Sequence, residues 1–285
     1  MRDSLYESSL PDLKAGIAKS SECIAHIHMH FELLYVRSGI IPVMIAGTIY
    51  TLYPGDCAVI LPGIVHHHMD AEKGNSMFLA VCAPHFAGQY EETLKENFAR
   101  TPVVRTSDMP PTVTFLLETL INQLQNQKEF TQYKYQIILS TFQLFFAYIL
   151  PQLRLEKREQ IDLLDLAPHI MDYISKNIAK KLTLEMVSKE LGISKYKISK
   201  FFANQLQLNF NQYVNLLRIK AAKKMLTTTN KSITTICYES GFSAVRTFNT
   251  VFLQNTGLTP KEYRQKHLSG NEESKYNFYL DSVSV

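Results

Sequence analysis

Three histidines and a glutamate alternate along the stretch HIHMHFE, which runs from residue 26 to residue 32. On a β-strand, residues of equal parity point to one face of the sheet. Four side chains would therefore line one side: His26, His28, His30 and Glu32. Neutral imidazoles and a carboxylate suit a divalent transition metal. Leu34 and Val36 share this parity and would supply the apolar wall that small-molecule pockets usually have.

Short alternating or apolar runs, broken by turn residues, surround these histidines. The predicted strands cover residues 23–37, 40–46, 48–52, 57–60 and 77–82. The breaks between them include Ser38-Gly39, Pro54-Gly55-Asp56 and Pro62-Gly63, and the triplet His66 to His68 falls in a predicted loop. Regularly spaced short strands with such turns favour an all-β sandwich or barrel.

A second pattern, of two short helices joined by a turn, lies near the other end of the chain. A short helix is predicted from an apolar stripe made of Ile233, Ile236 and Cys237. Gly241 then permits a turn, because a positive φ costs glycine little, and Ser243 is the predicted N-cap of a second helix. The inward face of that second helix consists of Phe248, Val251 and Phe252. Gly257 is predicted to end it.

The segment Gly241–Arg264 resembles the signature of the AraC family of bacterial transcription regulators. The matched positions are Gly241, Phe242, Phe248, Phe252, Gly257, Thr259, Pro260, Tyr263 and Arg264. The resemblance implies a transcription regulator that binds double-stranded DNA. It also makes RNA polymerase an expected partner and the bacterial cytoplasm the expected location.

An internal repeat predicts a first helix-turn-helix upstream of the second. Its turn and core positions are Gly192, Ile193, Ser194, Ile198 and Phe202, and the second copy has one extra residue after its serine. Family members usually have glycine where this chain has Gln207, so Asn204 or Asn209 is expected to take the left-handed conformation instead. The connecting helix, residues 210–226, would be about 25 Å long. With the widths of its neighbours, it can hold two recognition helices about one DNA turn, or ~34 Å, apart.

Outward positions early in each recognition helix are the predicted DNA contacts. In the first copy they are Lys195, Tyr196, Lys197, Ser199 and Lys200. In the second copy they are Ala244, Val245, Arg246, Asn249 and Thr250. Arg can bridge guanine and Asn can pair with adenine, so Arg246 and Asn249 are the expected sequence readers. For Lys195 and Lys200, contact with phosphate alone is an equal alternative.

The N-terminal histidines also fit a family pattern. The spacing H-x-H-x-x-x-E, followed by P-G-D and P-G-x-x-H, resembles the cupin barrel. In metal-binding cupins the matching positions would be His26, His28, Glu32 and His66. In AraC-like regulators, the resemblance implies, such a barrel usually holds a small organic effector without metal. Both alternatives stay open: effector-binding residues His26, His28, Glu32, Leu34, Val36 and His66, or a divalent metal on the four cupin positions.

Charge and composition limit the class of protein. Residues 167–267 contain 16 Lys and Arg against 5 Asp and Glu, whereas residues 1–166 contain 13 against 18. Such a concentration of positive charge is typical of a polyanion-binding domain. The four cysteines are scattered without a C-x-x-C pattern, which indicates buried thiols in a reducing compartment. Residues 135–153 lack charges but are interrupted by polar residues, so a buried helix is favoured over a membrane span.

Two further helices, 112–127 and 131–150, resemble the dimerisation helices that follow the sensor in this family. An alternative is that they only cap the barrel. The stripe predicted to be buried in the second helix is Ile137, Ile138, Thr141, Leu144, Phe145, Tyr148 and Ile149. The resulting order of domains is a sensor barrel at 1–110, helices at 111–153, a charged linker at 154–166, a DNA-binding domain at 167–267 and a tail at 268–285.

The predicted fold class is α+β, with a cupin-like β-barrel and a helical pair followed by an all-α domain with two helix-turn-helix motifs. The predicted function is a DNA-binding transcription regulator, a homodimer controlled by a small effector, with no required cofactor, no membrane partner and no enzyme activity. The alternative is a metal-dependent cupin enzyme or metal sensor joined to a DNA-binding module. The His26, His28, Glu32 and His66 set is the sole support for that alternative.

Overall fold

The computed structural model describes residues 10–19, 25–69, 71, 74–125, 132–158 and 163–268. The chain divides into two compact units between Asp165 and Leu166. The predicted tail at 268–285 lies outside the described residues except for its first position. Among the described helices, none is long and apolar enough to cross a membrane.

Two antiparallel sheets form the centre of the N-terminal unit. The larger sheet has the order β1-β7-β2-β5-β9, with β1 at Leu13–Ala18, β2 at Phe31–Ser38, β5 at Cys57–Ile60, β7 at Ser76–Cys82 and β9 at Val103–Val104. The smaller sheet has the order β4-β3-β6, with β3 at Ile41–Ile45, β4 at Thr48–Leu52 and β6 at His66–His68. A short pair joins β8 at Asn97–Ala99 to β10 at Leu155–Lys157. Apolar residues of both larger sheets belong to one core.

The strand predicted over residues 23–37 is wrong in its first part. Residues 23 and 24 lie outside the described residues, and the regular strand β2 begins only at Phe31. Before it, His26 forms an isolated bridge with His66, and the chain bends at Met29 and His30. The backbone N–H of Gly63 donates to the carbonyl of His28, so tertiary contacts rather than a sheet ladder fix this stretch. The predicted His66–His68 loop is instead strand β6.

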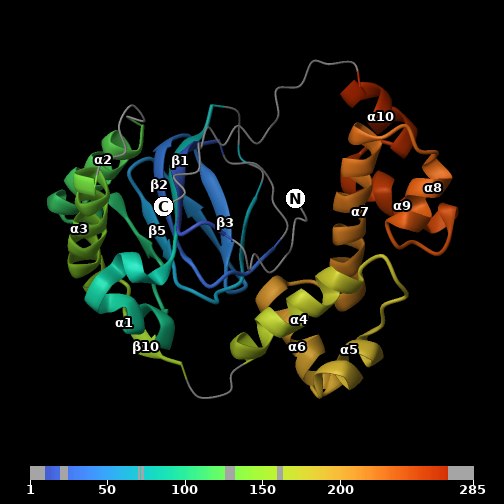
Figure 1. Ribbon diagram of the computed structural model, residues 1–285, viewed down its shortest axis with the longest axis horizontal. Coiled ribbons are helices and arrows are strands. Elements are labelled where there is room, and N and C mark those ends of the chain that lie inside the picture. Colours follow the sequence, from blue (N-terminus) through green and yellow to red (C-terminus); the bar gives the residue numbers. More distant parts are fainter. Residues whose placement is uncertain are drawn as a thin grey trace. The chain divides into compact units, whose positions relative to one another are not determined.

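Helices cover one side of the larger sheet (Figure 1). Three short helices come first: η1 at Pro84–Tyr90, α1 at Glu91–Glu96 and η2 at Thr106–Asp108. The long helices α2 at Pro111–Gln125 and α3 at Gln132–Ile149 follow, and η3 at Leu150–Gln152 comes last. The ring of Phe31 on β2 packs edge-on against Phe142 and Phe146 of α3, at centroid distances of 5.6 and 4.9 Å. The helices α2 and α3 therefore belong to the same core as the sheet.

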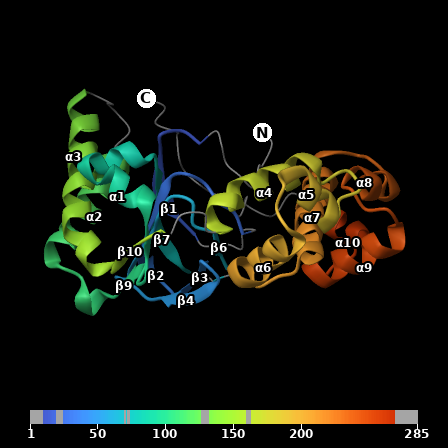
Figure 2. The ribbon, with the colours of Figure 1, turned by 90° about the horizontal axis from the view of Figure 1, so that it is seen from below.

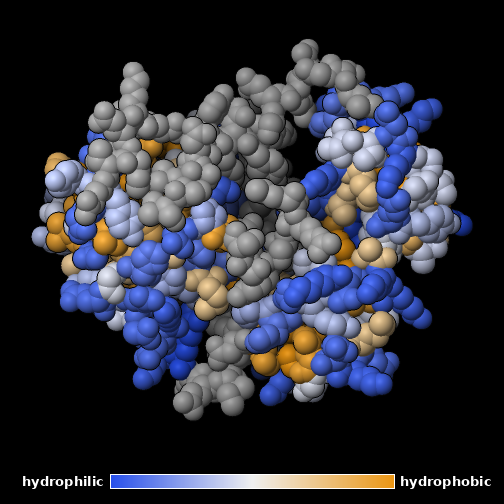
Figure 3. Space-filling view, in the orientation of Figure 1, coloured by the Kyte–Doolittle hydropathy of each residue, from blue (hydrophilic) through white to orange (hydrophobic). Residues whose placement is uncertain are grey.

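The predicted apolar stripe of α3 is only half buried. Ile138, Phe145 and Ile149 are fully buried, whereas three others are exposed by 41–47%: Ile137, Leu144 and Tyr148. The stripe is wider than the face that packs on the sheet, so its outer edge remains on the surface of the unit. Figure 3 shows apolar patches among hydrophilic residues over α2 and α3.

The C-terminal unit is entirely helical. It contains α4 at Leu163–Asn177, α5 at Leu184–Leu191, α6 at Lys195–Leu206, α7 at Phe210–Thr228, α8 at Ile233–Glu239, α9 at Val245–Thr256 and α10 at Pro260–Leu268. The first of these, α4, carries Pro168 inside it. Within this unit α7 runs from the α5–α6 pair to the α8–α9 pair (Figure 1), and Figure 2 shows the same helices from below.

Candidate functional site

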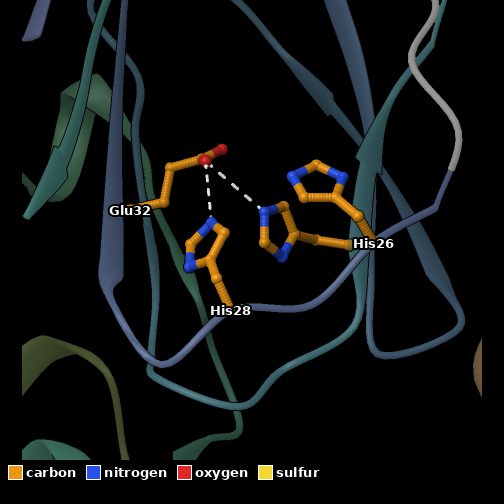
Figure 4. Close-up of side chains that lie close together, drawn as sticks. His26, His28 and Glu32 are labelled. Atoms are coloured by element: carbon orange, nitrogen blue, oxygen red, sulfur yellow. Dashed lines mark ion pairs between the residues drawn. The ribbon is translucent and has the colours of Figure 1, made fainter. Parts of the chain in front are cut away.

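The four cupin positions come together in the N-terminal unit. One ligand atom from each of four residues lies within 4.8 Å of the others: His26, His28, Glu32 and His66. His28, Glu32 and His66 are buried to 2% exposure or less, while His26 is partly buried. Figure 4 shows the ring of His28 pointing at the carboxylate of Glu32, with His26 beside them.

Backbone contacts fix the orientation of two of these rings. The Nδ1 atom of His28 is 3.0 Å from the carbonyl oxygen of His30, and Nδ1 of His66 is 2.8 Å from the carbonyl oxygen of Ile64. A carbonyl oxygen only accepts, so both Nδ1 atoms must carry the hydrogen. The Nε2 atoms then face Glu32 Oε2, at 3.5 Å from His28 and 3.4 Å from His66.

The other carboxylate oxygen of Glu32, Oε1, also has a hydrogen-bond partner. His68 Nε2 donates to Glu32 Oε1 at 2.9 Å. Burial alone would raise the pKa of Glu32, but the facing imidazoles of His66, His28 and His68 hold it well below its usual range. Burial, and then the neighbouring rings of His66 and His28, lowers the pKa of His26 well below its usual value. The cluster therefore presents an ionised Glu32 carboxylate beside a neutral His26 ring.

Not every predicted histidine joins the cluster. The bend before β2 leaves His30 out of this group of ligand atoms, and its ring centroid lies 6.1 Å from that of His28. His68, by contrast, was not predicted as a site residue and contacts Glu32 directly. Placing the histidine triplet on a strand would have found it, because residues 66 and 68 share parity. Leu34 and Val36 are buried in the core on the same face of β2 as Glu32.

The first helix-turn-helix consists of α5 and α6. Gly192 has the left-handed φ of +66°, and Ser194 caps α6 by accepting the backbone N–H of Lys197 at 3.3 Å, as predicted. Ile198, Phe201 and Phe202 form the buried side of α6. The five predicted contact positions on α6 are all exposed: Lys195, Tyr196, Lys197, Ser199 and Lys200.

The second helix-turn-helix consists of α8 and α9. The predicted N-cap Ser243 is wrong: the residue before α9 is Ala244, which has no side-chain acceptor. The extra residue in the second copy moves the helix start by one position. Val245 is consequently half-buried against the core of this motif, whereas Arg246, Asn249 and Thr250 are exposed along α9.

The end of α6 also differs from the prediction. Gln207 itself takes the left-handed conformation, with φ +53° and ψ +30°, and neither Asn204 nor Asn209 does. Asn209 is instead the N-cap of α7, where it exchanges hydrogen bonds with Gln212 in a capping box. Its side chain is therefore already used to begin the next helix.

The two motifs are joined into one body by contacts around α7. Arg218 on α7 donates to the carbonyl of Ile178 at 3.0 Å and to that of Lys180 at 2.9 Å. Gly241, in the turn before α9, lies so close to this segment that a Cβ atom there would be 2.2 Å from the Ile178 oxygen. The 19 residues of α7 span about 28 Å between the two motifs.

Comparisons with known proteins agree with both units. An AraC-like ligand binding domain matches residues 14–139, and a helix-turn-helix domain matches residues 187–266. The chain therefore has the architecture of a transcription regulator with a ligand-binding domain. It belongs to the AraC family.

Individual relatives cover different parts of the chain. The HTH-type regulator YijO of Escherichia coli is 29% identical over 64% of this chain and 62% of its own length. The regulator SAR0107 of Staphylococcus aureus is 34% identical over 41% of this chain, but the matched segment spans only 16% of that protein. Apo ToxT from Vibrio cholerae shares the fold, with a TM-score of 0.53 and 14% identity over 90% of this chain and 98% of its own. ToxT has also been crystallised with an unsaturated fatty acid bound, with a TM-score of 0.50 and 16% identity over 96% of this chain and 100% of its own.

Proposed function

We propose that this protein is a sequence-specific DNA-binding transcription regulator whose N-terminal unit binds a small effector. The observation that carries the proposal is the pair of helix-turn-helix motifs held on one long helix in a strongly basic unit. Residues 167–267 contain 16 Lys and Arg but only 5 Asp and Glu. Such an excess of positive charge is expected of a domain that binds a polyanion.

The spacing of the motifs suits one face of a DNA duplex. The helices α6 and α9 lie at opposite ends of α7 (Figure 1). Its length of about 28 Å, with the widths of the flanking helices, approaches the ~34 Å between successive major grooves. One chain would therefore place both recognition helices on a single operator half.

The two recognition helices would contribute differently to binding. Three exposed lysines on α6, Lys195, Lys197 and Lys200, supply attraction to phosphate. Lys195 is 3.3 Å from Glu185, but an exposed pair of this kind contributes little and leaves the lysine available. On α9, Arg246 and Asn249 match the donors and acceptors of guanine and adenine edges.

The N-terminal unit is the proposed sensor. Its effector would contact the polar cluster at Glu32 while Leu34 and Val36 contribute the apolar wall. The fatty-acid complex of ToxT supports a small organic effector as one class. We assign the cluster to sensing rather than to catalysis, because it is joined in one chain to a DNA-binding unit.

A homodimer is part of the proposal. Four apolar side chains on α3 recur at helical spacing and are at least 41% exposed: Tyr133, Ile137, Leu144 and Tyr148. A second copy of the chain would cover this face. Contact with RNA polymerase and a cytoplasmic location are further parts of the proposal, and both follow from the proposed regulatory role.

The DNA-binding proposal is tested by selecting binding sites from random-sequence DNA with the full-length protein. A recurring sequence is expected, and a pool without enrichment would contradict the proposal. Arg246→Ala should then weaken binding to the selected site by about 1–3 kcal/mol and relax one base position. The matched control is Gln254→Ala, an exposed position at the far end of α9, which should bind like wild type. An equal loss on selected and random DNA would show that Arg246 contacts phosphate alone.

A further inference from the structure

The cluster around Glu32 brings four potential ligand atoms within 4.8 Å of one another. Three atoms point at one another inside the N-terminal unit: Nε2 of His28, Nε2 of His66 and Oε2 of Glu32. The Nε2 atom of His28 is buried and makes no hydrogen bond. Since Nδ1 of His28 donates to a carbonyl, a neutral ring directs the lone pair of Nε2 at the carboxylate. Two acceptors facing each other in a buried site repel each other unless a hydrogen or a cation lies between them.

The distances distinguish the two cations that could lie there, a proton and a metal ion. A proton shared by an imidazolium and a carboxylate would draw nitrogen and oxygen to about 2.7–2.9 Å. The observed separations are 3.5 Å for His28 and 3.4 Å for His66. Ligand atoms about 2.0–2.2 Å from one tetrahedral zinc ion are about 3.3–3.6 Å apart. The separations of His28 and His66 from Glu32 match atoms that surround a common ion, and the full set of four ligand atoms lies within 4.8 Å.

The surroundings of the cluster have the form that supports metal ligands. Ligating histidines almost always donate their other ring nitrogen to a carbonyl or carboxylate, which fixes the tautomer. His28 and His66 do so to the carbonyls of His30 and Ile64. The second carboxylate oxygen of Glu32 accepts from His68 at 2.9 Å, which leaves Oε2 directed at the two histidines. His26, whose ring centroid is 4.3 Å from that of His66, completes the set.

We propose that this cluster binds one first-row divalent transition-metal ion per chain, and that the ion is the effector of the regulator. Three imidazoles and one carboxylate favour zinc, iron, nickel or manganese, whereas calcium and magnesium prefer all-oxygen sites. The ion would join the bend before β2 to strands β2 and β6. Its differential affinity for two states of the chain would then change DNA binding. The role of the ion as effector rests on the proposed function.

The metal site is tested on the full-length protein, purified without a histidine tag and stripped with a chelator. Zn²⁺ and Co²⁺ are titrated separately, with metal content measured by mass spectrometry and cobalt coordination by visible absorption. One ion per chain is expected. His68→Ala removes only the partner of Glu32 and should weaken binding about 10–100-fold. Glu32→Gln and His28→Gln remove ligands and should weaken it further.

The matched control is His67→Gln. This residue is the middle member of the same histidine triplet, but it lies at the opposite parity of β6 and outside the cluster. It should retain the wild-type stoichiometry. Circular dichroism of each stripped variant separates loss of the site from loss of the fold, and the nearly isosteric Glu32→Gln decides the question if His28→Gln does not fold. Less than one ion per wild-type chain, or equal loss in His67→Gln, would overturn the site.

Sensing is tested separately, by measuring the affinity for the selected DNA with and without Zn²⁺. An affinity that changes at least 5-fold in wild type and stays constant in Glu32→Gln supports the ion as effector, because allosteric couplings of about 5–150-fold are typical. Metal binding with no change in DNA affinity would overturn the sensing role and leave a structural ion. Absence of DNA binding in every state, with one ion still bound, would contradict the proposed function and leave the metal site standing.

Discussion

Replacing Gln207 by glycine should stabilise the C-terminal unit. Gln207 ends α6 in the left-handed conformation, with φ +53°. That conformation costs a residue with a Cβ atom about 1–2 kcal/mol. Glycine removes this strain but adds freedom to the unfolded chain, which costs about 0.4–1 kcal/mol. The midpoints of these two ranges differ by about 0.8 kcal/mol, so the expected net gain in the free energy of unfolding is about 0.5–1 kcal/mol.

The second copy of the motif supplies the reciprocal experiment. Gly257 ends α9 with φ +70°, and no atom lies within 4 Å of the position that a Cβ would take. Gly257→Ala should therefore destabilise the unit by a similar amount through backbone strain without a steric clash. Gln207→Ala removes the side chain and keeps the strain, so it separates the two contributions at residue 207.

Thermal unfolding of the full-length protein measures these changes. The transition of the C-terminal unit is identified by its upward shift when the selected DNA is added, because a ligand of the folded state stabilises it. For a unit of about 100 residues, the expected change is an increase of about 2–8 °C for Gln207→Gly. A decrease, or an equal increase in Gln207→Ala, would refute the strain argument.

Three further predictions concern other contacts. Gly241→Ala should destabilise the C-terminal unit by about 2 kcal/mol or more in urea unfolding, because its Cβ would meet the Ile178 oxygen; wild-type stability would contradict the close approach. Burial opposes ionisation of Asp56, but backbone N–H groups and Arg105 outweigh it and lower its pKa. The free energy of unfolding of wild type should exceed that of Asp56→Asn by about 1–3 kcal/mol at neutral pH. This difference should disappear as the pH falls below about 4 and through the lowered pKa of Asp56. A difference in stability that stays constant with pH would exclude the carboxylate as its source. Leu144→Arg should give a monomer in analytical ultracentrifugation if α3 forms the dimer interface, and an unchanged dimer would place the interface elsewhere.

Residues with a single physical role were predicted well from the sequence. Gly241 and Gly257 have the positive φ values that the pattern required, and Phe248 and Phe252 are fully buried. The basic composition of the C-terminal unit likewise needs no tertiary information. These features depend on backbone sterics and on burial of large apolar side chains, both of which leave local patterns.

Features fixed by distant contacts were predicted less well. The bend at Met29 and His30 depends on Gly63 and on the bridge to His66, which no local pattern shows. Helix α9 begins one residue later than predicted, because the second copy has one extra residue between the turn glycine and the N-cap. The outer edge of the α3 stripe is exposed because helical spacing identifies apolar residues but not the width of the surface that covers them.

The anchoring of Arg218 and Gly241 on the segment after α4 has a consequence for operator sequences. Because the two motifs form one body, the rotation between α6 and α9 about the duplex axis is fixed by the protein. Each inserted base pair turns the second target about 35° around the duplex, since one turn takes 10–10.5 base pairs. Natural binding sites should therefore conserve the number of bases between their two contacted segments as strictly as the bases themselves.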